Sequence, residues 1–477
     1  MPMSDQALSL RQKALKVNLA RRFYGTFAEI GAGQEVARHF FQAGGASGSI
    51  AKTISAYDMV FSDHIYGKEA SGRYVCEPRL EKMLEREFDL LTERLGELKG
   101  KDHSFFAFAN TVAALNFQRT NEAHGWLGVR FQSSPGSKAN DVIIHVRMLD
   151  PQNLLQQDAL GIMGVNLTYG ALCMHSTPEL MVRQLMDHLD SGRMEVNYVR
   201  VAGPAFAGVD NRLLNLQLVK EGYTSAVMFN EHGQIVLPAD YLYKKDILLV
   251  RGSYRPPTLV SLDMIKTGLA NFARVAKLPE TQVMTIAEIT ISTLQEDGEE
   301  IANEDFLARV ELLSTLGQKV LISNFPQYYR LTQYLASFRA RQVGLVLGVY
   351  NFKQIFDEEY TNVPGGLMGA MGQLFAPNVR VFVYPYMSED KSEFLKMENL
   401  VVDPQHQHLY EHVKAQGQLH DIKDFHEEWL FIYSRKVLNM IINDEPGWEK
   451  FVPESVAQAI NEKCLFGAPC FISKKKK

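Results

Sequence analysis

Cysteine, long apolar runs and surplus basic charge are all scarce in this 477-residue sequence. Its four cysteines, Cys76, Cys173, Cys464 and Cys470, form no Cys-x-x-Cys pair, so we expect reduced thiols and a cytoplasmic location. No apolar run approaches the ~18 residues of a membrane-spanning helix, and the N-terminal segment lacks the apolar core of a secretory signal. Fifty basic against fifty-five acidic residues give a net charge of −5, which argues against a nucleic-acid partner.

The composition is that of a folded protein with more than one domain. Hydrophobic residues make up 46% of the chain and charged residues 22%, which excludes an intrinsically disordered protein. A length of 477 residues exceeds one ordinary hydrophobic core, so we expect two or three domains. We find no repeat of fixed period and no long low-complexity linker.

Residues 283–385 show the clearest pattern, because short apolar segments alternate there with amphipathic ones. The pattern predicts strands at Val283–Ser292, Val320–Asn324, Val343–Val349 and Val379–Tyr384. It predicts helices at Phe306–Leu316, Tyr328–Arg341, Phe352–Tyr360 and Leu367–Phe375. Such alternation is typical of right-handed βαβ crossovers in a mostly parallel sheet, whose carboxyl edge is the usual ligand side. Ser323-Asn324, Tyr350-Asn351 and Pro385-Tyr386 are the residues expected at that edge.

The rest of the chain predicts a mixed arrangement. Pro78–Leu98 carries apolar residues at helical spacing, and a Ser-Ser-Pro-Gly-Ser turn separates strand candidates Trp126–Gln132 and Val142–Met148. After about residue 400 the sequence becomes polar and helical. We therefore predict an α/β fold with a mixed N-terminal region over 1–275, a parallel βαβ domain over 276–400 and a helical C-terminal segment over 401–477.

A glycine-rich stretch near the N-terminus carries the strongest local signal. Tyr24–Ile30 is a predicted strand, Gly31-Ala32-Gly33 a turn and Val36–Phe41 an apolar helical segment, with a second glycine cluster at Gly44–Gly48. Glycine removes the Cβ atom, so such turns allow close approach of a ligand or another chain. The alternative is that the glycines only let the helix and the sheet pack together.

Two general nucleotide motifs fit this turn incompletely. A dinucleotide site requires Gly-x-Gly-x-x-Gly, but Val36 takes the third glycine position, and no acidic residue lies about twenty positions further on. Glu29-Ile30-Gly31-Ala32-Gly33 looks like the first glycine loop of methyltransferases. An obvious second strand ending in an acidic residue is missing, so both interpretations stay open.

Gly25-Thr26-Phe27, together with Ile30 and Gly33, resembles the opening motif of nicotinate-nucleotide adenylyltransferases. The whole chain also resembles a bacterial family of unestablished function to which that enzyme's name has been attached. The resemblance implies a phosphate-binding turn, ATP as the candidate cofactor, and no metal other than Mg²⁺ brought by the nucleotide. Its residues are Gly25, Thr26, Phe27, Gly31, Gly33 and Gln34.

The sequence departs from that family at the residues that perform the chemistry. The two family histidines, which contact phosphates, fall on Gly31 and Gln34, and the Asp-Pro pair falls on Ala28-Glu29. Ile291-Ser292-Thr293 resembles the family's Ser-Thr phosphate loop, but Leu294 stands where an arginine is expected. Neutral groups do not replace charge-assisted hydrogen bonds to a triphosphate.

His408-Leu409-Tyr410-Glu411-His412 fits the His-x-x-Glu-His pattern of some zinc peptidases. Two imidazoles four residues apart on a helix can hold zinc. The polar neighbours Gln405, Gln407 and Lys414 are instead typical of a solvated helix. We predict that His408 and His412 face solvent and bind no metal.

Gly365–Gly372 is a second unusual glycine tract. A glycine-rich helix costs about 1 kcal/mol per glycine relative to alanine, so close packing or a partner must support it. Two hypotheses about function follow. The first is a non-catalytic protein that self-associates as a scaffold or assembly and binds nucleotide weakly at most. The alternative is a nucleotide-handling enzyme that transfers adenylyl groups from ATP. No catalytic residue is identified, so enzymatic activity is left open.

Overall fold

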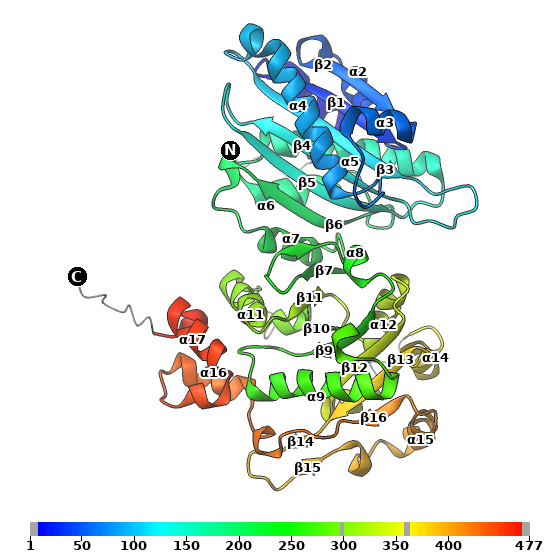
Figure 1. The fold of residues 1–477 in the computed structure, drawn as a ribbon, viewed down its shortest axis with the longest axis vertical. Helices are drawn as coiled ribbons and strands as arrows, with labels where there is room; N and C mark the ends of the chain where they lie inside the picture. The colour runs from blue at the N-terminus through cyan, green and yellow to red at the C-terminus, as the bar shows by residue number, and fades with distance from the viewer. Residues whose placement is uncertain (1–7, 296–299, 357–362, 470–477) are drawn as a thin grey trace, which may run out of the picture. The chain divides into compact units, whose positions relative to one another are not determined.

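The computed structural model describes residues 8–295, 300–356 and 363–469. The chain divides into two compact units, Met1–Ser225 and Ala226–Lys477, each coloured as a continuous range in Figure 1. Both units combine helices with a large sheet, which confirms the predicted α/β class. The division falls at Ser225 instead of near residue 275, because the strands that follow Ser225 pair within the second sheet.

Unit 1 contains a six-stranded mixed sheet with the order β2-β1-β3-β4-β5-β6. Its strands are β1 (Phe23–Gly31), β2 (Ile50–Ala56), β3 (Ser104–Ala113), β4 (His124–Gln132), β5 (Ala139–Met148) and β6 (Met194–Ala202). β1 is parallel to both β2 and β3, whereas β3 to β6 form an antiparallel meander. The predicted pair of strands around the Ser-Ser-Pro-Gly-Ser turn is the β4–β5 hairpin.

The helices of unit 1 are α1 (Leu10–Leu19), α2 (Val36–Ala43), α3 (Met59–Tyr66), α4 (Glu77–Lys99), α5 (Asn153–Cys173), α6 (Pro178–Arg183) and α7 (Asn211–Lys220). Neighbouring residues of β3 point to opposite faces of the sheet. Phe105 packs with Phe88 of α4. Phe106 lies in a different cluster, which contains Phe27 of β1 and Phe40 of α2. α4 and α2 therefore cover opposite faces, as the apolar spacing in each helix requires.

The connections around β1 create a topological switch point. β1 leads through α2 to β2 on one side, and β2 leads through α4 to β3 on the other side of β1. Because the two connecting helices lie on opposite faces, a crevice forms where the carboxyl ends of β1 and β3 meet. Gly31 and Ala113 are the last residues of these two strands.

Unit 2 contains an eight-stranded sheet with the order β16-β13-β12-β9-β10-β11-β7-β8. Its strands are β7 (Ala226–Phe229), β8 (Ile235–Val236), β9 (Asp246–Arg251), β10 (Val283–Thr290), β11 (Lys319–Ser323), β12 (Gln342–Gly348), β13 (Val379–Tyr384) and β16 (Leu419–Asp421). Neighbouring strands pair in parallel except β11–β7 and β7–β8, so β7 alone runs against the other strands. The predicted mostly parallel sheet is confirmed.

The main helices of unit 2 are α9 (Leu259–Ala276), α11 (Asn303–Thr315), α12 (Tyr328–Ser337), α13 (Val349–Gln354), α14 (Gly366–Leu374), α15 (Gln407–Ala415), α16 (Ser434–Ile442) and α17 (Glu454–Lys463). Part of the predicted helix Phe352–Tyr360 lies outside the described residues. The region after residue 400 is helical as expected, but it also supplies β16, which pairs with β13. It therefore belongs to unit 2.

One expectation about cysteine is wrong. Cys464 is disulfide-bonded, whereas Cys173 carries a free thiol. Disulfides are rare in reducing compartments, so cysteine chemistry no longer supports the predicted location. In the described parts of the chain, we find no helix with the length and apolar character needed to span a bilayer.

Candidate functional site

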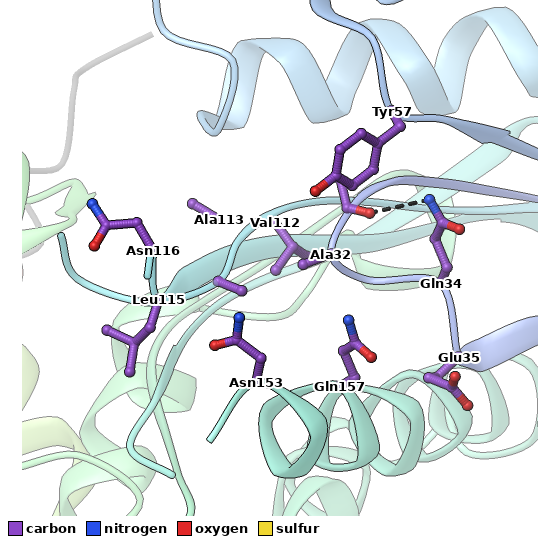
Figure 2. Close-up of a pocket in the computed structure, with 12 residues that line it drawn as sticks. Ala32, Gln34, Glu35, Tyr57, Val112, Ala113, Leu115, Asn116, Asn153 and Gln157 are labelled. Carbon is purple, nitrogen blue, oxygen red and sulfur yellow. Dashed lines mark hydrogen bonds between the residues drawn. The ribbon is translucent and has the colours of Figure 1, made fainter. Parts of the chain in front are cut away.

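A pocket of about 580 Å³ lies in unit 1 at the switch point between β1 and β3 (Figure 2). Its walls come from the glycine turn after β1, the residue after β2, the end of β3 with the following loop, and the start of α5. The lining residues are Gly31, Ala32, Gln34, Glu35, Tyr57, Val112, Ala113, Ala114, Leu115, Asn116, Asn153 and Gln157. This is where ligands bind in sheets of this topology.

The glycine turn is held against β3 by one side chain. Asn110 accepts a hydrogen bond from the Ile30 backbone N–H at 3.2 Å and donates one to the Gly33 carbonyl at 2.8 Å. Gly31 has φ +75°, and a Cβ atom added there would lie 2.4 Å from the Val112 carbonyl oxygen. A Cβ atom at Gly33 would lie 2.7 Å from the Asn110 side chain. Packing alone therefore requires glycine at position 31, and any side chain at position 33 would displace the Asn110 side chain.

The six residues of the predicted phosphate turn do not lie together. Gly25, Thr26 and Phe27 are inside β1. Gly25 faces the ring of Phe106, Thr26 Oγ1 donates to the Lys52 carbonyl, and Phe27 is fully buried. These three residues therefore form no turn. Gly31 and Gln34 do line the pocket, and Gln34 Nε2 donates to the Gly31 carbonyl at 3.2 Å (Figure 2). Gly33 lies behind them, against Asn110.

The start of α2, where a phosphate would bind, is occupied by a carboxylate of the same chain. Glu29 Oε1 accepts the Val36 N–H at 2.8 Å, and Oε2 accepts the Ala37 N–H at 3.1 Å. Backbone N–H groups of this kind hold phosphates in dinucleotide-binding proteins. In this protein they are already bonded to Glu29. The only acidic residue among the pocket-lining side chains is Glu35, which pairs with Arg38 at 3.1 Å.

The remaining polar lining is almost entirely neutral. Four carboxamides, from Gln34, Asn116, Asn153 and Gln157, accompany the phenol of Tyr57, and no lysine, arginine or histidine is among the twelve lining residues. Asn116 is bonded to Thr120. The side chains of Tyr57, Asn153 and Gln157 make no hydrogen bond to any residue that the structure describes. Figure 2 shows Tyr57 on one side of the pocket and Asn153 and Gln157 on the opposite side.

Sequence reasoning missed most of these residues. Tyr57 directly follows β2, a strand that no sequence pattern predicted. β3 ends at Ala113, which brings Asn116 to the pocket. Asn153 and Gln157 lie in the first turns of α5, and neither belongs to a recognisable motif. No local pattern therefore pointed to these residues.

Unit 2 has a switch point of the same type, and a buried tyrosine follows the strand beside it. β9 lies between β10 and β12, with β11 and β13 beyond them. Tyr254, just after β9, is 3% exposed, and its hydroxyl donates to the Val250 carbonyl at 2.7 Å. A Cβ atom at Gly252 would lie 3.0 Å from the Tyr254 ring. We therefore take the unit 1 pocket as the candidate site.

The other predicted sites are placed as follows. His408 and His412 are both exposed, as expected, and no group of three or more metal-binding side chains occurs in the described ranges. Ser292 and Thr293 bond to Thr290 at the start of a short helix after β10. The glycine tract forms α14, which buries Ala370 and Met371 and leaves Met368 exposed. A Cβ atom at Gly372 would meet no atom within 4 Å, so the tract is not closely packed there.

Glu29 gives the pocket a testable pH signature. Burial raises its pKa from 4.5 to about 7, against the opposing effect of the Val36 and Ala37 N–H groups. A carboxyl with a raised folded pKa stabilises the fold below the unfolded pKa and loses that contribution as pH rises through 7. Burial and the His124 charge lower the pKa of His145 to about 3, so its contribution instead falls as pH drops below about 6.5.

Between about pH 4.5 and 6.5, the contribution of Glu29 to stability falls as pH rises, whereas that of His145 increases. The pH dependence of the wild-type protein alone therefore does not separate the two contributions. We expect the unfolding free energy of wild type, minus that of Glu29→Gln, to fall by roughly 3 kcal/mol between pH 4.5 and 7.5. Urea denaturation of both proteins across this range measures the difference, in which the His145 term cancels. A difference that stays constant with pH would show that Glu29 keeps an ordinary pKa.

Comparisons with known proteins leave the family open. No family model and no curated protein matches the chain. Among solved structures, the competence/damage inducible protein CihA from Agrobacterium tumefaciens is 13% identical, with a TM-score of 0.24, over 36% of this chain and 97% of its own. A competence-damaged protein (CinA) superfamily member from Enterobacter cloacae is 11% identical, with a TM-score of 0.25, over 38% of this chain and 96% of its own. Likenesses this distant carry no functional argument, and the resemblance to nicotinate-nucleotide adenylyltransferases stays a prediction from the sequence.

Proposed function

We propose that unit 1 binds an unphosphorylated nucleoside in the pocket at the β1–β3 switch point. The observation that supports this most directly is a pocket at the ligand edge of the sheet that is lined by carboxamides and a phenol and by no cationic side chain. A volume of about 580 Å³ falls within the usual range for small-molecule sites.

The charges argue against phosphate groups. A triphosphate requires cations or unused backbone N–H groups to replace its hydration. At the start of α2 the Val36 and Ala37 N–H groups are bonded to Glu29. Glu35 adds negative charge to the wall of the pocket. ATP, the cofactor candidate from the sequence, is therefore expected to bind more weakly than its nucleoside.

The neutral groups suit the polar edges of a nucleoside. Carboxamides both donate and accept hydrogen bonds, which matches ribose hydroxyls and base edges. Asn153 and Gln157 are one turn apart on α5, so both side chains reach the same side of the pocket. Tyr57 offers an aromatic ring opposite them for contact with the base. On binding, the polar groups of the ligand would thus replace hydrogen bonds to water with hydrogen bonds to Tyr57, Asn153 and Gln157.

The proposal is for binding without catalysis. Glu35 and Tyr57 are the only titratable residues of the lining, and neither is paired with a nucleophile or a second acid. Self-association, the other element of the first hypothesis, remains a second proposal. It is supported by the exposed Met368 side chain beside the open position at Gly372 in α14.

A panel of nucleosides and nucleotides tests the binding proposal. We expect at least one of adenosine, guanosine, cytidine and uridine to raise the melting temperature of the full chain. A ligand at a hundredfold excess over its dissociation constant stabilises the folded state by about 2.7 kcal/mol. The 5′-triphosphate of that nucleoside should bind at least tenfold more weakly by calorimetry.

Two variants locate the binding site. Gln157→Ala and Asn153→Ala should each weaken nucleoside binding about three- to tenfold, because each removes one hydrogen-bonding group. Gln42→Ala, on the exposed part of α2, is the matched control and should leave affinity unchanged. Tighter binding of the triphosphate than of the nucleoside would refute the proposal.

A further inference from the structure

Several exposed apolar residues lie in or beside the chain segments that line the pocket. We define the apolar rim as Tyr57, Met59, Val60, Phe61, Phe117 and Leu154. Phe117 is fully exposed, Tyr57 is 81% exposed, and each of the others is more than half exposed. Large apolar side chains rarely cluster on a surface unless that surface binds something.

Chain connectivity places the rim beside the pocket. Tyr57 itself lines the pocket, and Met59 to Phe61 follow it within four residues. Phe117 is next to the lining residue Asn116, and Leu154 is next to the lining residue Asn153. Consecutive Cα atoms are about 3.8 Å apart, so Phe117 and Leu154 each lie next to a lining residue, whereas Met59, Val60 and Phe61 are two to four residues from Tyr57. Three separate segments contribute, so the rim is not the tip of a single loop.

Two of the other exposed apolar residues of unit 1 lie in segments that contribute nothing to the pocket. Leu98 lies near the end of α4 and Leu180 lies on α6, each in a segment that does not line the pocket. Single exposed apolar residues of this kind are ordinary on protein surfaces. Exposed apolar residues in three segments that line the pocket therefore call for an apolar occupant beside it.

We propose that the ligand of unit 1 is a nucleoside that carries an apolar substituent, such as an acyl or alkyl chain, which leaves the pocket and covers the apolar rim. This inference rests on the proposed function, since the nucleoside head is what fills the pocket. One amphiphilic molecule satisfies both surfaces: its polar head bonds to the carboxamides, and its apolar part removes the rim from water. A partner that covered only the rim would leave the pocket unfilled.

The test compares each of the four nucleosides with its 5′-O-octanoyl and 3′-O-octanoyl derivatives, by calorimetry below the concentration at which the derivatives form micelles. Each methylene buried on the rim tightens binding about fourfold. We expect at least one derivative to bind wild type at least 30-fold more tightly than its parent nucleoside. The double variant Val60→Ser and Phe117→Ser should lower this ratio at least fivefold.

The controls separate this inference from the proposed function. The double variant should bind the parent nucleoside within twofold of wild type, because neither changed residue lines the pocket. Leu98→Ser, an equally exposed apolar residue on α4, should leave the ratio unchanged. If the nucleosides bind and no derivative binds more than twofold tighter, the inference fails and the proposed function stands.

The remaining outcomes are also decisive. Derivatives that bind more tightly to wild type and to the double variant alike would overturn the inference, since the chain would then contact another surface. A double variant that changes the mass seen by light scattering while the ratio stays the same would identify the rim as a contact between copies. If neither nucleosides nor derivatives bind, both proposals fail.

Discussion

Replacement of Gly31 by alanine is expected to lower the free energy of unfolding of unit 1 by about 3 kcal/mol. The backbone of Gly31 has φ +75°, a conformation that costs an L-residue roughly 1 kcal/mol or more. The new Cβ atom would also lie 2.4 Å from the Val112 carbonyl oxygen. This oxygen belongs to the backbone of β3, so it cannot turn aside as a flexible side chain would. The end of β3 must move, which weakens its pairing with β1.

Hydrogen exchange of the β1 and β3 amides measures this loss within unit 1, without assuming that the two units unfold together. Gly48→Ala is the control, because a Cβ atom there meets nothing within 4 Å and the backbone needs no left-handed conformation. We expect this change to alter stability by less than about 0.5 kcal/mol. If the two substitutions have equal effects, the backbone of the turn accommodates the new Cβ atom at little cost in free energy. This wall of the pocket would then be flexible.

Glu288→Ala is expected to have the largest effect in unit 2, a loss of about 4 kcal/mol. Glu288 lies on β10, is fully buried and accepts hydrogen bonds from Arg251 at 2.5 and 2.9 Å and from Ser323 at 2.5 Å. The Arg251 side chain is itself only 10% exposed. Removal of the carboxylate takes away the Glu288 counter-ion of the mostly buried Arg251 guanidinium. Such a loss costs far more free energy than loss of a surface ion pair.

Hydrogen exchange of the β9 and β10 amides reports the effect of this change. Glu389→Ala breaks the exposed pair with Lys436 in the same unit and should cost less than 1 kcal/mol. The double variant Arg251→Met and Glu288→Leu should recover part of the loss, because two apolar side chains need no charge partner. A cost below 1 kcal/mol for Glu288→Ala would show that water reaches Arg251.

The sequence predicted those parts of the fold whose signals are local. Strands of unit 2 such as β12 and β13 are buried apolar runs bounded by helices, and their order along the chain was enough to predict a parallel sheet. β7, β8 and β16 have four, two and three residues, too few to show any period. Strands this short do not reveal which sheet they join, and the predicted boundary therefore lies about fifty residues after the division at Ser225.

The candidate site was harder to predict, since its residues meet only through sheet order. The glycine turn was visible because Gly31 and Gly33 follow an apolar strand. Asn153 and Gln157 belong to no local motif, and α5 reaches the turn because it packs against α2, where Gly164 lies against Val36. Gly25-Thr26-Phe27 resembles a loop motif in the sequence, but the structure places these residues inside a strand. There, Gly25 leaves space for the ring of Phe106.

The two hydrogen bonds of Asn110 to Ile30 and Gly33 bear on the thermodynamics of recognition. They fix the backbone that forms one wall of the pocket before any ligand arrives. The conformational entropy of that wall is lost during folding and not during association, so a ligand meets a rigid template at this side. Discrimination between ligands should then arise from shape and from unsatisfied polar groups, with little adaptation of the chain to a poorly fitting molecule.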